Sequence, residues 1–172
     1  TTPPASADVQ SIDAKGAYAV PGFVDIHLHG GGGVEFMNAG PEEIRAGCAA
    51  HARHGTTTLL PTTLAAPEEM TLRMIRAVRQ GQKDTTECTI AGVHLEGPFL
   101  SPAQSGAQSP DALAQPAPAL WKRLLDEWPD GVRVMGAAPE LPGAMALGDA
   151  LRERGVLASI AHSDAEYETC RR

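Results

Sequence analysis

Residues 21–33 read PGFVDIHLHGGGG, and this stretch decides the fold class. An apolar run at 23–28 lies between a Pro-Gly pair and a glycine run, which is typical of a short β-strand bounded by turns. A helical pattern follows at 41–54, where a proline and two glutamates suit the first turn and a glycine comes directly after the last residue. One strand followed by one helix is the repeating unit of a parallel α/β fold.

The strand-helix order recurs along the chain. Four more strands are expected, at 56–60, 90–95, 132–137 and 157–161. Three more helices are expected between them, at 67–80, 119–128 and 144–154. Five such units in succession predict an α/β fold that forms the first part of a (β/α)8 TIM-type barrel over residues 21–172. Because a complete barrel takes about 250 residues, about three further units are expected in the intact protein.

Residues 1–20 do not fit a strand-helix unit. Within them, SIDAKGAYAV at 11–20 predicts a short strand pair with a turn at Lys15-Gly16. We expect this segment to belong to a small accessory β domain that precedes the barrel.

Composition and charge limit the classes of function. The chain has 42% hydrophobic and 20% charged residues, close to globular averages, and no apolar run approaches the ~18 residues of a membrane helix. Its net charge of −7 argues against nucleic-acid binding, because an acidic surface repels phosphate. Three widely spaced cysteines form no CxxC pair, and the first ten residues lack a secretory pattern. These features favour a cytoplasmic protein without nucleic-acid or membrane partners.

Two histidines end the first strand. His27 and His29 lie at i and i+2, so both imidazoles point to one face at the carboxyl end, which is the catalytic end of a parallel barrel. Two neutral imidazoles on one face suit a divalent transition metal, and the glycines that follow leave room for an ion and a substrate. An isolated HxH could equally be two histidines satisfied within a strand.

Two further strands end in potential ligands. Glu96 closes the third strand beside glycine and proline, where a buried carboxylate needs a partner, and His162 closes the fifth. Taken alone, Glu96 could be a helix-capping or salt-bridged glutamate, and His162 could be a buried core histidine, with no metal involved. Inward side chains of strands one, three and five of a barrel can converge, so His27, His29, Glu96 and His162 together predict a metal site without thiolate.

Other polar residues fit simpler roles. His51 and His54 lie near the C-terminal end of a helix, where histidine interacts favourably with the helix dipole. His94 shares a face with Glu96 and is expected to pack inside the fold or to brace that carboxylate. Asp25 could orient a ligand histidine. Glu140 closes the fourth strand and could support the site or be solvated.

Five motifs resemble those of a known family. In order they are PGFVDIHLHG, GTTTLLPTTL, GVHLEGPFLSP, APE and AHSDA, and they cover nearly all of residues 16–168. This arrangement resembles the N-terminal portion of N-acetylglucosamine-6-phosphate deacetylases of the amidohydrolase superfamily. GVHLEGPFLSP is the most specific motif, because related dihydroorotases and hydantoinases generally use a carboxylated lysine at the metal in place of this glutamate.

The resemblance implies a reaction and a cofactor. It implies hydrolysis of the N-acetyl group of N-acetylglucosamine 6-phosphate, giving glucosamine 6-phosphate and acetate. Glu96 and His162 match the family's metal ligands, while His27 and His29 match an HxH pair that supports a second ion where it is present. The expected cofactor is a divalent metal, zinc or iron, as one or two ions. The resemblance also implies a homodimer when the protein is intact.

The match departs from the family in one loop. Where the family usually has Gly-Ala-His, this chain has Gly106-Ala107-Gln108, so the expected substrate contacts are Ala107 and a glutamine that carries no charge. The family's second metal-binding histidine, its phosphate contacts and its aspartate general base lie beyond the fifth strand. The catalytic residue is therefore unknown from this chain, which ends at Arg172.

Two other functions remain open at this point. One is an amidohydrolase that acts on a cyclic amide or an N-acyl amino acid. The other is an inactive metal-binding fragment that takes up metal without turnover and serves as a structural or interaction module.

Overall fold

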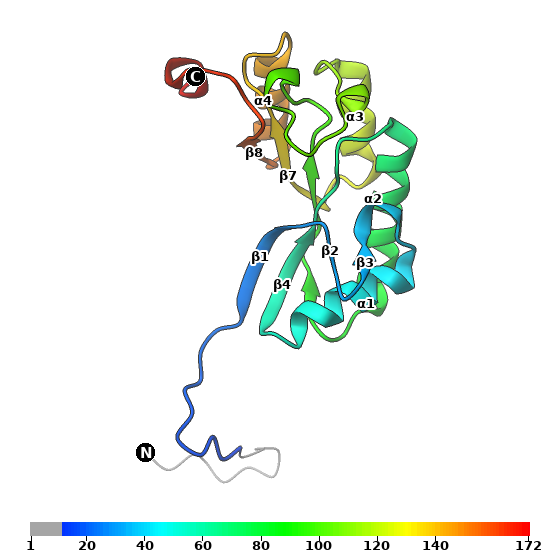
Figure 1. Ribbon diagram of the computed structural model, residues 1–172, viewed down its shortest axis with the longest axis vertical. Coiled ribbons are helices and arrows are strands. Elements are labelled where there is room, and N and C mark those ends of the chain that lie inside the picture. Colours follow the sequence, from blue (N-terminus) through cyan, green and yellow to red (C-terminus); the bar gives the residue numbers. More distant parts are fainter. Residues whose placement is uncertain (1–11) are drawn as a thin grey trace.

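The computed structural model describes residues 12–172 as a mixed α/β fold built on parallel strands (Figure 1). The main strands are β1 (Phe23–Leu28), β4 (Thr56–Pro61), β5 (Thr89–Ile90), β6 (Val93–Glu96), β7 (Val132–Ala137) and β8 (Leu157–Ile160). The helices are α1 (Pro41–Ala52), α2 (Glu68–Asp84), α3 (Pro118–Glu127), α4 (Ala144–Glu153) and α5 (Tyr167–Cys170). A small antiparallel pair, β2 (Gly30–Gly31) and β3 (Val34–Glu35), and three 3₁₀ turns at Phe36–Asn38, Pro102–Gln104 and Pro110–Ala112 complete the fold.

The parallel strands lie in two groups of three, in the orders β1-β4-β5 and β6-β7-β8. A single parallel bridge between Thr62 and His94 connects the groups. The predicted third strand at 90–95 is therefore divided in two. Gly92 causes the break, because its φ of +142° suits glycine and a Cβ there would overlap the carbonyl oxygen of Gly131. The chain thereby leaves β4 and pairs with β7.

The second predicted helix is longer than expected. It continues to Asp84, past the end predicted at residue 80, which directly precedes Gly81. Gly81 instead lies where α2 crosses α1, and a Cβ there would lie 2.9 Å from the carbonyl oxygen of Pro41. This glycine permits close helix packing and is not a terminator.

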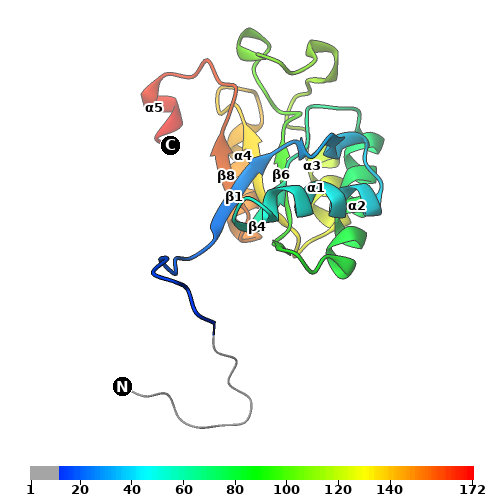
Figure 2. The same ribbon diagram turned by 60° about the horizontal axis from the view of Figure 1, so that its bottom comes forward.

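The segment before β1 forms the predicted turn without the predicted strands. Lys15 and Gly16 both have positive φ, and the Ala17 N–H donates to the Ala14 carbonyl at 2.8 Å. Residues 12–22 contain no strand, because no other segment of residues 12–172 pairs with them; Ser11 lies outside the described residues. Figure 2 shows this segment extending away from the layered body.

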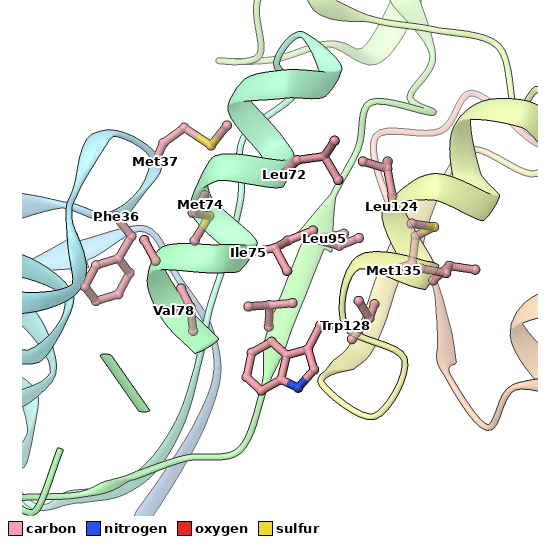
Figure 3. Close-up of a cluster of buried hydrophobic side chains, with 14 of the residues drawn as sticks. Phe36, Met37, Leu72, Met74, Ile75, Val78, Leu95, Leu124, Trp128 and Met135 are labelled. Atoms are coloured by element: carbon pink, nitrogen blue, oxygen red, sulfur yellow. The ribbon is translucent and has the colours of Figure 1, made fainter. Parts of the chain in front are cut away.

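The core lies between the helices and the central strands (Figure 3). The apolar face of α2, including Ile75, packs over Leu95 of β6 and toward Leu124 of α3. All three side chains are fully buried. This layer holds β6 in place and fixes the position of the glutamate at its end.

The outer strands differ from the central ones. Val24 of β1 and Leu157 of β8 are 67% and 61% exposed, although both strands are apolar in sequence. Within residues 12–172, no helix is long and apolar enough to span a bilayer.

Candidate metal centre

The four predicted ligands converge on the end of β6. Glu96 Oε2 lies 3.1 Å from His29 Nε2 and 3.7 Å from His27 Nε2, and Glu96 Oε1 lies 3.0 Å from His162 Nε2. The Glu96 side chain is only 8% exposed, whereas the three imidazoles open toward solvent. Side chains from β1, β6 and the segment after β8 therefore meet at one carboxylate.

The orientation of two imidazoles leaves nitrogen lone pairs facing Glu96. His29 Nδ1 donates to the Thr62 carbonyl at 3.2 Å, and His162 Nδ1 donates to the Gln104 carbonyl at 2.9 Å. A neutral imidazole that donates through Nδ1 has an unprotonated Nε2. Each Nε2 thus faces a carboxylate oxygen, an arrangement that requires a cation between them, either a proton or a metal ion.

The donor set fits a divalent metal. One ligand atom from each of His27, His29 and Glu96 lies within 4.8 Å of the others. The separations of 3.1 and 3.7 Å between Glu96 Oε2 and the two imidazole nitrogens are compatible with nitrogen and oxygen ligands at about 2.0–2.2 Å from one ion. Among residues 12–172, the ion pairs of Glu96 involve only histidines and no lysine or arginine. A cation is therefore the natural partner of this buried carboxylate.

Two threonines that the sequence reasoning did not single out hold the strand ends together. The hydroxyl of Thr63 accepts the Glu96 N–H at 3.0 Å, and the hydroxyl of Thr62 accepts the Leu28 N–H at 3.0 Å. Both threonines are fully buried. At these positions the strands diverge, and within residues 12–172 the N–H groups of Glu96 and Leu28 have no partner in a neighbouring strand. The two hydroxyls accept hydrogen bonds from these N–H groups in its place. The sequence feature that could have indicated this role is the Thr62-Thr63 pair directly after Pro61, the last residue of β4.

Gln108 lies directly on the centre. Its amide nitrogen donates to Glu96 Oε2 at 3.0 Å, and its amide oxygen accepts the Ala65 N–H at 2.7 Å. These two contacts determine which way the amide points. Gln108 is buried, and the neighbouring Ala107 is exposed. The resemblance placed a substrate contact in this loop but gave no sign that the glutamine would bind the glutamate.

The other polar residues brace the backbone. His94 Nδ1 donates to the Ile26 carbonyl at 2.9 Å, and the edge of its ring packs against His27. Burial lowers the pKa of His94, which keeps its ring neutral. His51 Nε2 bonds the Gly30 carbonyl at 2.8 Å. The Asp25 carboxylate accepts the His27 backbone N–H at 3.1 Å, and within residues 12–172 no hydrogen bond joins it to an imidazole, so it does not orient a ligand ring.

A comparison with protein families identifies the family to which this chain belongs. Residues 18–171 match the model described as "Amidohydrolase family". The chain belongs to the amidohydrolase family. Amidohydrolases are metal-dependent, and the His27, His29 and Glu96 group gives this one a possible metal site.

Several deacetylases resemble this amidohydrolase. N-acetylglucosamine-6-phosphate deacetylase of Lysinibacillus sphaericus is 33% identical over 93% of this chain and 42% of its own length. N-acetylgalactosamine-6-phosphate deacetylase of Escherichia coli O157:H7 is 30% identical over 88% of the chain and 40% of its own length. Among solved structures, a mutant of the Mycobacterium smegmatis N-acetyl-D-glucosamine-6-phosphate deacetylase, in complex with N-acetyl-D-glucosamine-6-phosphate, is 40% identical with a TM-score of 0.82, covering 88% of this chain and 39% of that one.

These comparisons confirm the predicted family resemblance. The chain spans about two fifths of the length of the relatives that it matches.

Proposed function

We propose that the protein containing this amidohydrolase chain removes the N-acetyl group from N-acetylglucosamine 6-phosphate, giving glucosamine 6-phosphate and acetate. The observation that carries the proposal is the meeting of His27, His29 and His162 around Glu96 at the ends of three strands. The names of the relatives support the acetamido sugar phosphate as substrate.

We also propose that residues 21–172 form the first five units of a (β/α)8 barrel, preceded by an accessory segment at 1–20. The parallel strand pairings β1-β4-β5 and β6-β7-β8, linked through Thr62 and His94, support this arrangement. The apolar exposed residues of β1 and β8 also support it, since further strands would cover them.

His27, His29, Glu96 and His162 are the proposed metal ligands. They would hold one or two zinc or iron ions, because both metals accept nitrogen and carboxylate oxygen. When bound, the ion would polarise the amide carbonyl and lower the pKa of water. The chain's own contribution is to orient the His29 and His162 imidazoles through their Nδ1 hydrogen bonds and to shield Glu96 from solvent.

Ala107 and Gln108 are proposed to face the substrate. The preceding Gly106 lies against the His162 ring, since a Cβ there would be 3.3 Å from Cε1. The loop therefore runs beside the reacting end of the site, with Ala107 open to solvent. The general base and the groups that bind phosphate are proposed to lie outside this chain.

A second candidate substrate is N-acetylgalactosamine 6-phosphate. The Escherichia coli relative that carries this name matches 88% of the chain, nearly the same share as the glucosamine enzymes. The two sugars differ only in the orientation of one hydroxyl. The metal centre would act on the same N-acetyl group in both sugars. Any selectivity between them must therefore come from contacts to the hydroxyls of the sugar ring.

For the intact protein, we propose a cytoplasmic location and a homodimer. Cys48, Cys88 and Cys170 are all free thiols, which suits a reducing compartment. The homodimer follows from the family resemblance.

The test combines metal content and acetate release. We expect purified protein to contain zinc or iron by elemental analysis and to release acetate from N-acetylglucosamine 6-phosphate. Glu96→Gln should lose both, whereas Glu153→Gln, which makes the same change at an exposed position, should lose neither. Metal without acetate release from either sugar phosphate would favour an inactive metal-binding fragment, and activity on cyclic amides or N-acyl amino acids would favour a different amidohydrolase. Absence of metal would overturn the proposed site.

A further inference from the structure

His162 has an unusual backbone conformation. Its φ of +46° lies in the left-handed region, which is unfavourable for a residue with a Cβ. Within residues 12–172, the only other non-glycine residue with positive φ is Lys15, in an exposed turn. Surrounding contacts must therefore hold His162 in this conformation.

The loop at 101–108 holds one side of the His162 turn. The His162 carbonyl accepts the Ser101 N–H at 2.9 Å, and the Gln104 carbonyl accepts from the His162 ring at 2.9 Å. The Gln104 side chain also donates to the Asp164 carboxylate at 2.8 Å. These bonds fix His162 itself but leave the backbone that follows it to be held from another direction.

Glu140, in the connection between β7 and α4, holds that backbone. Its Oε1 accepts the Asp164 N–H at 2.7 Å, and its Oε2 accepts the Ser163 hydroxyl at 2.8 Å. The Ser163 hydroxyl oxygen in turn accepts the Ala165 N–H at 3.0 Å. One carboxylate thus anchors three consecutive residues directly after the histidine.

The electrostatics agree with this anchoring. Burial opposes ionisation of Glu140, but hydrogen bonds from the Asp164 N–H, its own N–H and the hydroxyls of Ser163 and Ser101 outweigh burial and lower its pKa. The ionised carboxylate, which accepts charge-assisted hydrogen bonds through both oxygens, is therefore the form present near neutral pH.

We propose that Glu140 is a positioning residue of the metal centre, which keeps His162 in its left-handed conformation so that Nε2 faces Glu96. This inference rests on the proposed metal site. Both Glu140 oxygens bond to Ser163 and Asp164, so the carboxylate acts through the turn and not as a ligand. Without it, the turn would relax toward negative φ and the imidazole would leave the 3.0 Å contact with Glu96.

Cobalt titration of the full chain tests the proposal. Co²⁺ reports on both affinity and ligand geometry through its visible absorption. We expect Glu140→Ala to weaken Co²⁺ binding by about 10–100-fold, the usual effect of losing a group that orients a ligand, and to change the absorption spectrum. Glu140→Gln should recover most of the affinity, because its amide oxygen can accept the Asp164 N–H and its nitrogen can donate to the Ser163 oxygen.

Two further variants separate positioning from general destabilisation. Ser163→Ala removes one of the two Glu140 bonds and should give an intermediate loss of affinity, which keeps the test usable if Glu140→Ala fails to fold. Glu153→Ala, an equal change of charge at an exposed site on α4, should bind Co²⁺ like the wild type. Thermal unfolding without metal shows whether each variant retains the fold.

The outcomes distinguish the two proposals. Wild-type affinity and spectrum in both Glu140→Ala and Ser163→Ala would overturn the positioning role and leave the metal site intact. A loss of affinity in Glu140→Gln as large as in Glu140→Ala, with the spectrum of each unchanged, would also overturn it. A wild-type chain that takes up no Co²⁺ would overturn both proposals.

Discussion

β6 and β1 both end in proposed metal ligands, but their surroundings differ. All four residues of β6 are buried, with Leu95 lying beneath α2 and α3, and the Glu96 side chain is 8% exposed. β1 has only Leu28 buried, and the His27 side chain is 44% exposed. One centre therefore combines a carboxylate fixed by the core with histidines on an outer strand, where local hydrogen bonds do more of the positioning.

The difference also explains the arrangement of hydrogen bonds around the site. Glu96 is held by a packed strand and by two buried side chains, Thr63 and Gln108. His29 and His162 each rely on an Nδ1 bond to a backbone carbonyl. The core sets where the centre lies, and the loops set how the imidazoles point.

The largest expected effect compares the same substitution on the two strands. Val93 of β6 is fully buried and Val24 of β1 is 67% exposed. Val93→Ala should lower the free energy of unfolding by about 2 kcal/mol, from lost burial and a residual cavity. Val24→Ala should change it by less than about 0.5 kcal/mol. Chemical denaturation measures both, and equal losses would show that β1 is covered in solution.

Removal of the Gln108 amide should have the next largest effect. Gln108→Met keeps the volume but leaves the buried Ala65 N–H without its acceptor, which should cost about 1–3 kcal/mol of stability. Glu96 also loses a donor to Oε2, so metal affinity should change as well. Denaturation and Co²⁺ titration measure the two effects, with the exposed Gln80→Met as the control. Unchanged stability would mean that the amide is not held as described.

The sequence singles out the four proposed ligands because their signals are local. The i, i+2 spacing of His27 and His29 and the placement of Glu96 and His162 after apolar runs can be read directly from the chain. The supporting contacts are not local. Thr63 is separated from Glu96 by 33 positions, and no periodicity connects a threonine after one strand with the backbone of another.

The roles of two glycines also depend on distant contacts that the sequence does not reveal. Gly81 directly follows the predicted helix at 67–80, and Gly92 lies inside the predicted strand at 90–95. In the fold, Gly81 lies inside a helix against Pro41, and Gly92 bends a strand toward β7. Only the positions of distant segments decide which role a glycine has.

The Thr63 hydroxyl should contribute less than Gln108. Thr63→Val keeps the shape but removes the acceptor of the Glu96 N–H, which should cost about 1 kcal/mol. Thr71→Val, on α2 and also buried, controls for the loss of a buried hydroxyl away from the centre. A thermal unfolding series compares them, and an equal effect in both would assign no special role to Thr63.

The smallest expected effect is a pH dependence from Glu140. Its folded-state pKa lies below the ordinary 4.5, so the ionised carboxylate adds stability above that pH, and this stability is lost as the pH falls toward the lower folded-state value. Glu140→Gln cannot ionise, so its stability difference from the wild type should be constant near neutral pH and shrink below about pH 4.5. Denaturation at several pH values measures that difference, with Glu153→Gln as the control for general charge. A difference that grows on acidification would mean that Glu140 is bound in its protonated form, and the turn after β8 would then be held by a neutral hydrogen bond.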